Sequence, residues 1–492
     1  MSTTQDTWKK ESGYIWSMIG SAIGFANILS FSALCYKNGG GAFLIPYILA
    51  HTIIGLPMLF LEGIIGQKTR LPLVSAMGNI AGTSGRMLGW LGVLTCATIG
   101  GFYIVLTGFA VAYSYFSAAG MIGHDTAFFF KQTFLHDSGS IGVLGGFAGS
   151  ILISTLIVSV IAWVILARNI QTGVEKLCSI FLPLLAVLVV SFMLTSCFLP
   201  GALQGFKNFL IPDFAELKSW TLWRDVFGQV FLSLSLGLGI VTGYSRHNPS
   251  TFSIPRAMVR VAIGDFVISF LSGFAIFGCV GYMSTKGDIP LSSIVTSDSA
   301  FEIGFVIFPM ILAQFGEVIS RIVGPIFFFC VFIAGITGVF SIVENVAGNF
   351  EVEFRKSRKV AVAIAMGIVT LLAIPFCMGN GQHVIGAMAP MVLGNTMLMC
   401  GIGEIVIFLM ISQVVSRDAV WMLNNRRTLA FISIKYFILP MLVFSLMAAV
   451  LKEFSSPFQM VSLIRWGWFC LVVLVGYMLS RRHQSYAQAD LV

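Results

Sequence analysis

Runs of about 20 mostly apolar residues recur along this 492-residue chain, and they restrict its fold more than any other feature. A run of that length crosses the hydrocarbon core of a bilayer as one helix, and only helices and closed barrels satisfy all backbone polar groups there. We therefore predict an all-α integral membrane protein with 12 transmembrane helices. The windows are residues 13–35, 41–66, 88–117, 143–167, 177–197, 224–245, 258–283, 321–347, 359–377, 384–411, 430–451 and 463–480.

The overall composition excludes most other classes of protein. Hydrophobic residues make up 57% of the chain and charged residues 10%, and the mean hydropathy is +0.92. The connections between windows are too short to fold as a soluble domain, so we expect a single domain over residues 1–492. Walker loops and the G-x-S-x-G and H-E-x-x-H motifs are missing from the sequence, and no enzymatic activity is expected.

The distribution of basic residues predicts an orientation. By this assignment, loops on the side of the N-terminus hold 20 of the 29 Lys and Arg residues, among them Arg355, Lys356, Arg426 and Arg427. Because cytoplasmic loops carry such an excess, we expect a multi-pass protein of the plasma (inner) membrane with both termini in the cytoplasm. The net charge of +8 follows from the same asymmetry, so no nucleic-acid partner is expected. The oligomeric state stays unknown.

Two of the windows contain residues that do not suit a continuous membrane helix. "SAIGFANILSFS" (residues 21–32) and "FLSLSLGLGIVTGYS" (231–245) carry glycines and small polar residues at their middle. Small residues also allow helices to pack closely, but two such clusters in corresponding windows favour interrupted helices. We therefore predict an inverted repeat of five plus five helices over residues 13–197 and 224–411. Residues 430–480 add helices 11 and 12, and helices 1 and 6 are broken.

Several motifs in sequence order resemble one family of transporters, the neurotransmitter:sodium symporters, in their bacterial amino-acid type with the leucine-transporter-like fold. The motifs are "NGGGAFLIPYILAHTIIGLPMLFLEGIIGQ" (38–67), "FKNFLIPDF" (206–214), "GQVFLSLSLGLG" (228–239), "GFVIFPMIL" (304–312) and "AGITG" (334–338). The resemblance implies sodium-coupled symport of an amino acid across the plasma membrane by alternating access. It also implies two sodium ions and no organic cofactor.

The resemblance implies two sets of sodium ligands. The first sodium site would use Ala22, Asn27, Ser233 and Asp265 together with the carboxylate of the substrate. Direct contact between the ion and the substrate would make their binding mutually favourable. The second sodium site would use Gly20, Ile23, Ala334 and Thr337.

Asp265 also bears on chloride. Relatives that require chloride hold the anion with side chains that match Tyr47, Gln229, Ser233 and Ser269, and all four are present here. Because Asp265 could supply the same negative charge, and because two anions at low dielectric would repel each other, we predict chloride independence. The alternative is a protonated Asp265 that bonds to the backbone and carries no charge.

The substrate site implied by the resemblance surrounds Gly24. This glycine leaves room for a carboxylate beside the amide N–H groups of Phe25 and Ala26, at the exposed end of a half-helix. The side-chain pocket carries no charged residue, so a neutral and hydrophobic or aromatic amino acid is favoured. The full substrate set is Ala22, Gly24, Phe25, Ala26, Ile99, Tyr103, Leu232, Ser233, Ser235, Leu238, Gly338 and Ile342.

The gates differ from the usual pattern of the family. Ser30 and Ala389 stand where most relatives have an Arg–Asp pair, so the outer gate would close by packing of Phe31, Tyr103 and Leu232 or by neutral hydrogen bonds. At the inner gate Trp8 is kept, whereas Gln5 stands in place of an Arg. Lys9 or Lys10 paired with Glu351 or Glu353 is a possible substitute.

Three carboxylates inside the windows need partners. Glu62 resembles the family residue that accepts hydrogen bonds from the unwound backbone of helix 6. Glu344 and Glu404 could be similar struts or proton carriers. Two other functions stay open, namely a proton-coupled carrier or exchanger on the same fold, and a transport-inactive receptor or a channel.

Overall fold

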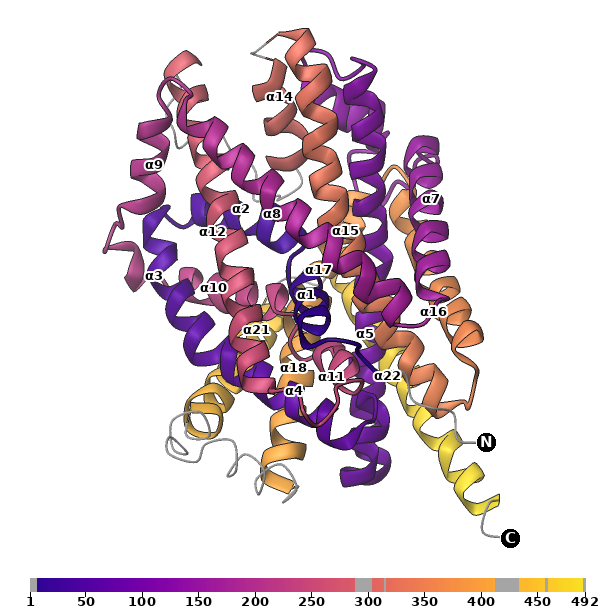
Figure 1. The fold of residues 1–492 in the computed structure, drawn as a ribbon. Helices are drawn as coiled ribbons and strands as arrows, with labels where there is room; N and C mark the ends of the chain where they lie inside the picture. The colour runs from indigo at the N-terminus through magenta and orange to yellow at the C-terminus, as the bar shows by residue number, and fades with distance from the viewer. Residues whose placement is uncertain (1–6, 288–302, 314–315, 412–432, 456–458, 490–492) are drawn as a thin grey trace.

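The computed structural model describes residues 7–287, 303–313, 316–411, 433–455 and 459–489 (Figure 1). Ten helical segments of this part are long and apolar enough to cross a membrane, and a bent pair, Glu11–Ala22 with Ala26–Lys37, is an eleventh candidate. The sixth predicted window forms two shorter helices. The all-α membrane fold is therefore confirmed, whereas the count of 12 spans and the inverted repeat stay predictions.

The first half of the chain contains the first five predicted spans. Its elements are α1 (Glu11–Ala22), η1 (Ala26–Ser30), α2 (Phe31–Lys37), α3 (Gly41–Ala50), η2 (His51–Gly55), α4 (Leu56–Thr69), α5 (Leu73–Ala118), α6 (Thr126–Phe128), η3 (Phe129–Phe134), α7 (Gly149–Leu166), η4 (Gln171–Glu175) and α8 (Lys176–Cys197).

The second half begins with two short connecting elements, α9 and η5. Its elements are α9 (Ala202–Leu210), η5 (Glu216–Lys218), α10 (Trp220–Ser233), α11 (Ile240–Ser245), α12 (Ile254–Gly287), η7 (Ile303–Ile307), α14 (Phe308–Ala313), α15 (Glu317–Glu353), α16 (Arg358–Ala373), η8 (Ile374–Cys377), α17 (Gly381–Ala389), η9 (Pro390–Thr396), α18 (Met397–Ile405), η10 (Val406–Ile411), η11 (Ser433–Ile438), α21 (Leu439–Ser455) and α22 (Met460–Ala489).

Several helices are longer than the apolar windows that predicted them. α15 begins four residues before the window at 321–347 and ends six residues after it, because polar helix ends stay helical outside the apolar stretch. α5 includes a bend at Ala81 and Gly82, where the glycine has φ of 60°. The third predicted span, residues 88–117, is therefore preceded in α5 by a short helix that ends at the bend, and the apolar window did not predict this helix.

The first break follows α1. Helix α1 ends at Ala22, Ile23 is extended (φ −77°, ψ 117°), and the helix resumes at an angle of 55°. The N–H of Gly24 has no helical acceptor here and donates instead to Asn27 Oδ1 (3.0 Å). A local side chain thus replaces the hydrogen bond that the break removes.

The second break separates α10 from α11. The six residues between Ser233 and Ile240 form turns, and three of them have positive φ: Ser235 (56°), Gly237 (73°) and Gly239 (78°). Glycine tolerates this conformation, whereas a serine is strained in it. Both segments that the sequence predicts to be broken are therefore interrupted near the expected glycines.

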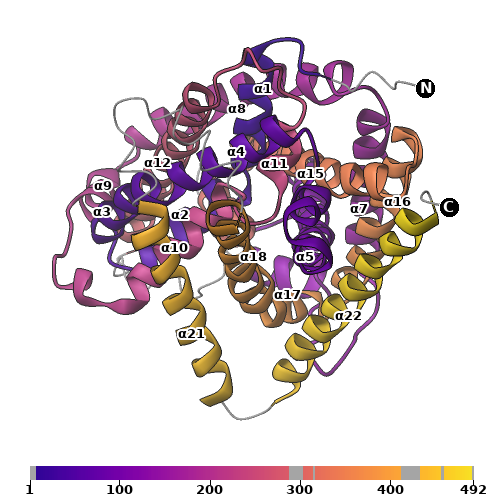
Figure 2. The ribbon, with the colours of Figure 1, turned by 90° about the horizontal axis from the view of Figure 1, so that it is seen from below.

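The two breaks face the centre of the bundle. α15 packs along α5 there, and α1 contacts α8, α12 and α15 (Figure 2). α21 and α22 lie at the periphery (Figure 2). In Figure 1, α11 lies toward one end of the bundle and α9 and α14 lie toward the other.

Candidate functional site

A cavity of about 660 Å³ lies between the two breaks and extends to Lys131 in η3 and to Asp137 in the loop that follows it. Most residues of the predicted substrate set line it; Gly24 and Ser233 do not. Phe102, Leu106 and Ser341 also line it and were missed, because they follow from the rotation of α5 and α15 rather than from a motif. The predicted residues that line the cavity are Ala22, Phe25, Ala26, Ile99, Tyr103, Leu232, Ser235, Leu238, Gly338 and Ile342.

Tyr103 crosses the floor of this cavity. Its hydroxyl lies so close to Gly24 that an added Cβ there would overlap it, and a Cβ at Gly338 would lie 2.7 Å from Tyr103 Cε1. The N–H of Phe25 donates to Tyr103 Oη (3.2 Å). The absence of side chains at the two glycines therefore allows the tyrosine ring to reach the break and its hydroxyl to bond to the N–H of Phe25.

The predicted first sodium site forms a connected polar cluster. Asn27 Nδ2 donates to Asp265 Oδ1 (2.6 Å), and Ser233 Oγ donates to Asp265 Oδ2 (3.3 Å). All three side chains are fully buried. Ala22 is the last residue of α1, where the final carbonyl groups lack helical partners. The cluster offers the several oxygen ligands that a hard cation prefers.

The residues that match a chloride site divide into two groups. Tyr47 Oη donates to Asp265 Oδ2 (3.4 Å), as Ser233 does, and Ser269 Oγ accepts from Asn27 Nδ2 (2.8 Å). Gln229 points elsewhere: its Nε2 donates to Ala26 O (2.7 Å), and its Oε1 accepts from Ser30 Oγ (3.2 Å). The carboxylate of Asp265 thus accepts from two of the hydroxyl groups, those of Tyr47 and Ser233, that match the chloride site.

The sequence did not indicate the histidine beside Asp265. His51 Nε2 lies 3.7 Å from Asp265 Oδ2 and 2.9 Å from the carbonyl oxygen of Ala262. One helical turn separates His51 from Tyr47, so the spacing could have suggested a shared face. The contact of His51 with Asp265 and Ala262 depends on how η2 packs against α12, and the sequence does not show this packing.

The predicted second sodium site lies between α1 and α15. Thr337 Oγ1 donates to the carbonyl oxygens of Ile333 (3.0 Å) and Ala334 (3.1 Å). A Cβ added at Gly20 would lie 3.2 Å from Thr337 Cβ, so these two positions are adjacent. Ile23 follows at the break. Gly20 and Thr337 therefore face each other across the contact of α1 with α15, and Ile23 and Ala334 lie within three residues of them in the same chain segments.

The broken sixth segment is held by buried side chains. The N–H of Gly237 donates to Glu62 Oε1 (2.8 Å), which is the contact expected for this carboxylate. Asn345 Nδ2 donates to the carbonyl oxygen of Leu238 (2.8 Å). Ser235 Oγ donates to Ser21 O (3.2 Å) and connects the two breaks.

One of the three side chains predicted to close the outer gate, Phe31, lies away from the cavity. The ring of Phe31 is fully buried against Phe43, Tyr47 and Phe209 and does not line the cavity, because α2 turns it toward α3 and α9. A gating role for Phe31 is therefore not apparent in this conformation. Neutral hydrogen bonds do occur near the mouth, since Ser30 bonds to Gln229.

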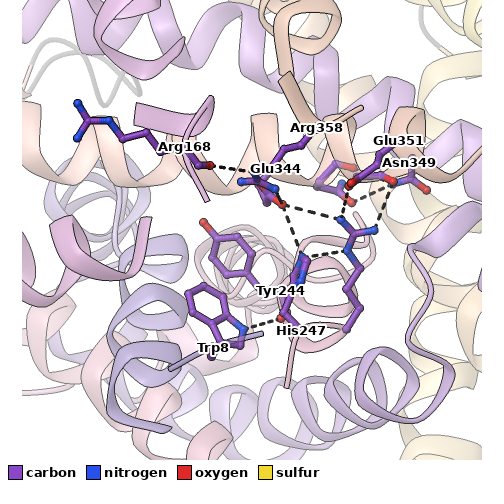
Figure 3. Close-up of polar contacts among 11 residues, drawn as sticks. Trp8, Arg168, Tyr244, His247, Glu344, Asn349, Glu351 and Arg358 are labelled. Carbon is purple, nitrogen blue, oxygen red and sulfur yellow. Dashed lines mark hydrogen bonds and ion pairs between the residues drawn. The ribbon is translucent and has the colours of Figure 1, made fainter. Parts of the chain in front are cut away.

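Trp8 packs against the end of α11 and the residues after it. Its Nε1 donates to the carbonyl oxygen of Tyr244 (2.9 Å), and its N–H donates to the carbonyl oxygen of His247 (3.2 Å) (Figure 3). The indole is 2% exposed. Trp8 thus attaches the segment before α1 to the end of α11. Gln5 lies outside the described residues.

The ion pairs around Trp8 correct one prediction. Glu351 accepts from Arg246 (3.2 Å), and Glu353 pairs with Arg86, so these carboxylates are not the partners of Lys9 and Lys10. The backbone N–H groups of the two lysines donate instead to a different carboxylate, Glu175, at 3.0 and 3.3 Å. The exposed lysine side chains gain little from an ion pair, whereas free amide groups before a helix need acceptors.

Glu344 is the centre of a buried network at this end. Both of its oxygens accept from Arg358 (3.0 and 2.8 Å), and Oε1 lies 3.7 Å from His247 Nε2 and 3.9 Å from Arg246 Nη2 (Figure 3). The network connects α15, α16 and the segment after α11. Of the two roles considered for Glu344, the geometry fits the strut.

The comparisons with known proteins agree with this arrangement. A model of the sodium:neurotransmitter symporter family matches residues 5–126 and 119–483. A sodium-dependent transporter of Methanocaldococcus jannaschii is 34% identical over 403 residues, which are 82% of this chain and 81% of that protein. The sodium-dependent transporter YhdH of Bacillus subtilis is 27% identical over 384 residues, 76% of this chain and 79% of that protein.

A solved structure shows the same fold. The crystal structure of MhsT in complex with L-phenylalanine matches with a TM-score of 0.78 at 24% sequence identity, over 90% of this chain and 99% of that chain. The two matches to the family model together cover most of the chain. This chain is a member of the sodium:neurotransmitter symporter family, and so a membrane transporter rather than an enzyme.

Proposed function

We propose that this protein carries one neutral, hydrophobic or aromatic amino acid together with two sodium ions, by alternating access and without chloride. Sodium-coupled transport itself follows from the family. The substrate, the number of ions, the plasma-membrane location and the cytoplasmic termini are parts of the proposal.

The observation that carries the proposal is the cavity between the breaks. A zwitterion needs a donor for its carboxylate and an acceptor for its ammonium group at one end. Around the first break, Phe25 N–H and Tyr103 Oη are suitable partners for a carboxylate, and Ser235 Oγ lies beside the same cavity. The positions predicted for the substrate side chain include Ile99, Leu238 and Ile342, and a buried charge among them would lack a partner.

The proposed ion coupling is supported by the position of Asp265. The cluster of Asn27, Ser233 and Asp265 is joined to the first break, because Asn27 accepts from the N–H of Gly24, so an ion there would neighbour a substrate carboxylate bound at the break. The Tyr47 and Ser233 hydroxyl groups donate to Asp265 and are therefore already paired with a negative group. A second anion among them would face repulsion at short range.

Counterflow in proteoliposomes tests the proposal. We expect uptake of labelled leucine, phenylalanine or tryptophan into liposomes preloaded with the same amino acid, with little exchange of lysine or glutamate. Gradients of sodium, protons and chloride are then imposed one at a time, and only the sodium gradient should drive accumulation.

Three results would contradict this function. Accumulation driven by a pH gradient alone would favour the proton-coupled carrier. Conductance without accumulation would favour a channel. Binding of the amino acid without counterflow would favour a receptor.

A further inference from the structure

Helix α9 lies at the outside of the bundle (Figures 1 and 2), and apolar side chains in it and beside it are exposed. Phe198, before α9, is 86% exposed, and Leu203 in its first turn is 66% exposed. Leu210, Ile211 and Phe214 are exposed as well. None of these five side chains lines the central cavity. A single exposed apolar side chain is common, whereas five in one short segment indicate a surface that binds something apolar.

The beginning of α9 lies where two predicted spans end. The apolar windows at 177–197 and 258–283 belong to α8 and α12, and α9 contacts both helices. A Cβ added at Gly201 would overlap the side chain of Thr285, and one added at Gly281 would lie 2.7 Å from the carbonyl oxygen of Gly201. Because an apolar window ends where the hydrocarbon core ends, this end of α9 lies at the boundary between the hydrocarbon and the lipid headgroups.

The other end of α9 packs against the turn that joins the first two windows. A Cβ added at Gly40 would overlap the carbonyl oxygen of Asn208, and one added at Gly41 would lie 2.7 Å from the carbonyl oxygen of Ile211. The glycines of the N-G-G-G motif thus leave room for the backbone at the end of α9. A turn between two apolar windows lies outside the hydrocarbon core. Both ends of α9 therefore lie at the boundary, on the side of the membrane away from Trp8, which precedes the first window.

The buried face of α9 contacts the first broken span and α12. The ring of Phe209 is fully buried, and its centroid lies 6.5 Å from that of Phe31 in α2 and 4.9 Å from that of Phe277 in α12. Phe206 stacks on Phe274 of α12 with the centroids 4.1 Å apart. Aromatic packing therefore fixes the rotation of α9, and a defined face of the helix points away from the protein.

The exposed face of α9 has an apolar part and a polar part. Leu203, Lys207 and Leu210 recur at helical spacing and form one exposed stripe, and Gln204 and Asn208 form the neighbouring one. An amphipathic helix of this kind lies in the membrane interface with its apolar side toward the acyl chains. A lysine between two leucines suits this place, because its apolar stem lies along the acyl chains while its ammonium group reaches a phosphate.

We propose that α9 is a membrane-interface helix that binds the phospholipid monolayer on the side away from Trp8. Leu203 and Leu210 contact the acyl chains next to the headgroups, and Lys207 binds a lipid phosphate. The opposite face of α9 holds Phe31 and the glycine turn, so the membrane fixes the end of α2 that lies away from the first break. This surface is separate from the predicted substrate and sodium positions.

Electron paramagnetic resonance of the full chain in phosphatidylcholine liposomes tests this position. A nitroxide is attached at Leu203→Cys or, as the matched control, at Gln204→Cys, in a chain whose exposed Cys197 and Cys470 are replaced by serine. We expect the label at position 203 to collide more with oxygen, which concentrates in hydrocarbon, and the label at position 204 to collide more with a water-soluble nickel chelate. Equal access of the nickel chelate to both labels would overturn the proposal. Broadening of the spectrum by a label on a second copy of the chain would also overturn it, because a protein would then cover the surface.

Thermal unfolding tests lipid binding with the native cysteines in place. Phosphatidylcholine added to the purified chain in detergent should raise the melting temperature, because a ligand of the folded state stabilises it. The rise should be smaller in Leu203→Ser and unchanged in Gln204→Ser, and Lys207→Gln should lose any preference for phosphatidylcholine over a glycolipid without phosphate. The same rise in the wild type and in both serine variants would contradict binding at the stripe.

Labelling of Cys35 tests whether the membrane fixes α2. Cys35 is fully buried in α2. In liposomes, a thiol reagent should modify it faster in Leu203→Ser than in the wild type, and at an unchanged rate in Gln204→Ser; mass spectrometry of peptides separates this site from Cys197. Equal rates in all three proteins would show that the protein alone holds α2, and the proposed anchoring would be wrong.

Discussion

Replacement of Asp265 by Asn tests the physical basis of the proposed coupling. The substitution keeps the shape of the side chain and removes its charge, next to the predicted sodium ligands Asn27 and Ser233, which lie 2.6 and 3.3 Å from its oxygens. Asp265 is itself a predicted ligand of this ion, and two unit charges even about 4 Å apart interact by about 4 kcal/mol at an effective dielectric constant of about 20. Since 1.4 kcal/mol is about tenfold in affinity, the loss corresponds to about three orders of magnitude.

We therefore expect Asp265→Asn to raise the Kd for sodium by about 100-fold to 1,000-fold in chloride-free buffer. Chloride should restore part of the affinity, because the hydroxyl groups of Tyr47 and Ser233 then become free to hold an anion. The assay is sodium titration of the purified protein, followed by binding of a labelled substrate, with gluconate or chloride as the anion.

Tyr47→Phe is the matched control. It removes one hydrogen bond to Asp265 but leaves the charge, so we expect an effect of about 1 kcal/mol and no response to chloride. Unchanged sodium affinity of Asp265→Asn without chloride would refute the electrostatic reasoning. Equal losses in both variants would show that hydrogen bonding, rather than charge, determines the affinity.

Three further variants examine the breaks and the closure beneath them. Gly24→Ala places a methyl group on the Tyr103 hydroxyl and should abolish substrate-induced thermal stabilisation, with partial recovery in the double variant with Tyr103→Phe; no recovery would contradict the overlap. Gly237→Ala places a side chain at positive φ and against the carbonyl oxygen of Met397, so it should lower the free energy of unfolding by about 1 to 3 kcal/mol. The control is Gly228→Ala in α10, where an added Cβ has no neighbour within 4 Å; it should raise the free energy of unfolding by up to about 1 kcal/mol. Trp8→Phe loses the bond to Tyr244 O, worth about 1 kcal/mol, and should increase labelling of the buried Cys178 by a thiol reagent added on the side of Trp8; unchanged labelling would contradict a closing role.

The breaks could be predicted from sequence because their cause is local. A glycine and small polar residues inside an apolar window weaken the helix wherever the window lies. The structure accordingly ends α1 at Ala22 and α10 at Ser233, next to Gly24 and Gly237. The large share of predicted substrate positions that line the cavity follows from the same two breaks together with the motifs around them.

The partners of charged residues could not be predicted in the same way. Glu351 pairs with Arg246, and Glu344 pairs with Arg358. Both ion pairs depend on how the segment after α11 packs against α15 and α16. Apolar periodicity carries no information about that packing. The pairing predicted for Lys9 and Lys10 was wrong for this reason: it considered the opposite charges of the residues and not their positions in the fold.

The sixth segment is held by groups that a ligand does not touch. Glu62 and Asn345 hold Gly237 N–H and Leu238 O, and neither of these side chains lines the cavity. The second break is therefore held in part by side chains that lie outside the predicted substrate set.

The first break is held by groups that are themselves predicted ligands. Gly24 N–H donates to Asn27, which would bind sodium, and Phe25 N–H donates to Tyr103, which would bind the substrate carboxylate. On these proposed assignments, a substrate and an ion would exchange one set of hydrogen bonds for another here, at little net cost in unpaired groups. Because α1 runs from the Trp8 segment to this break, such a change of partners would be the point where binding could alter closure at the other end.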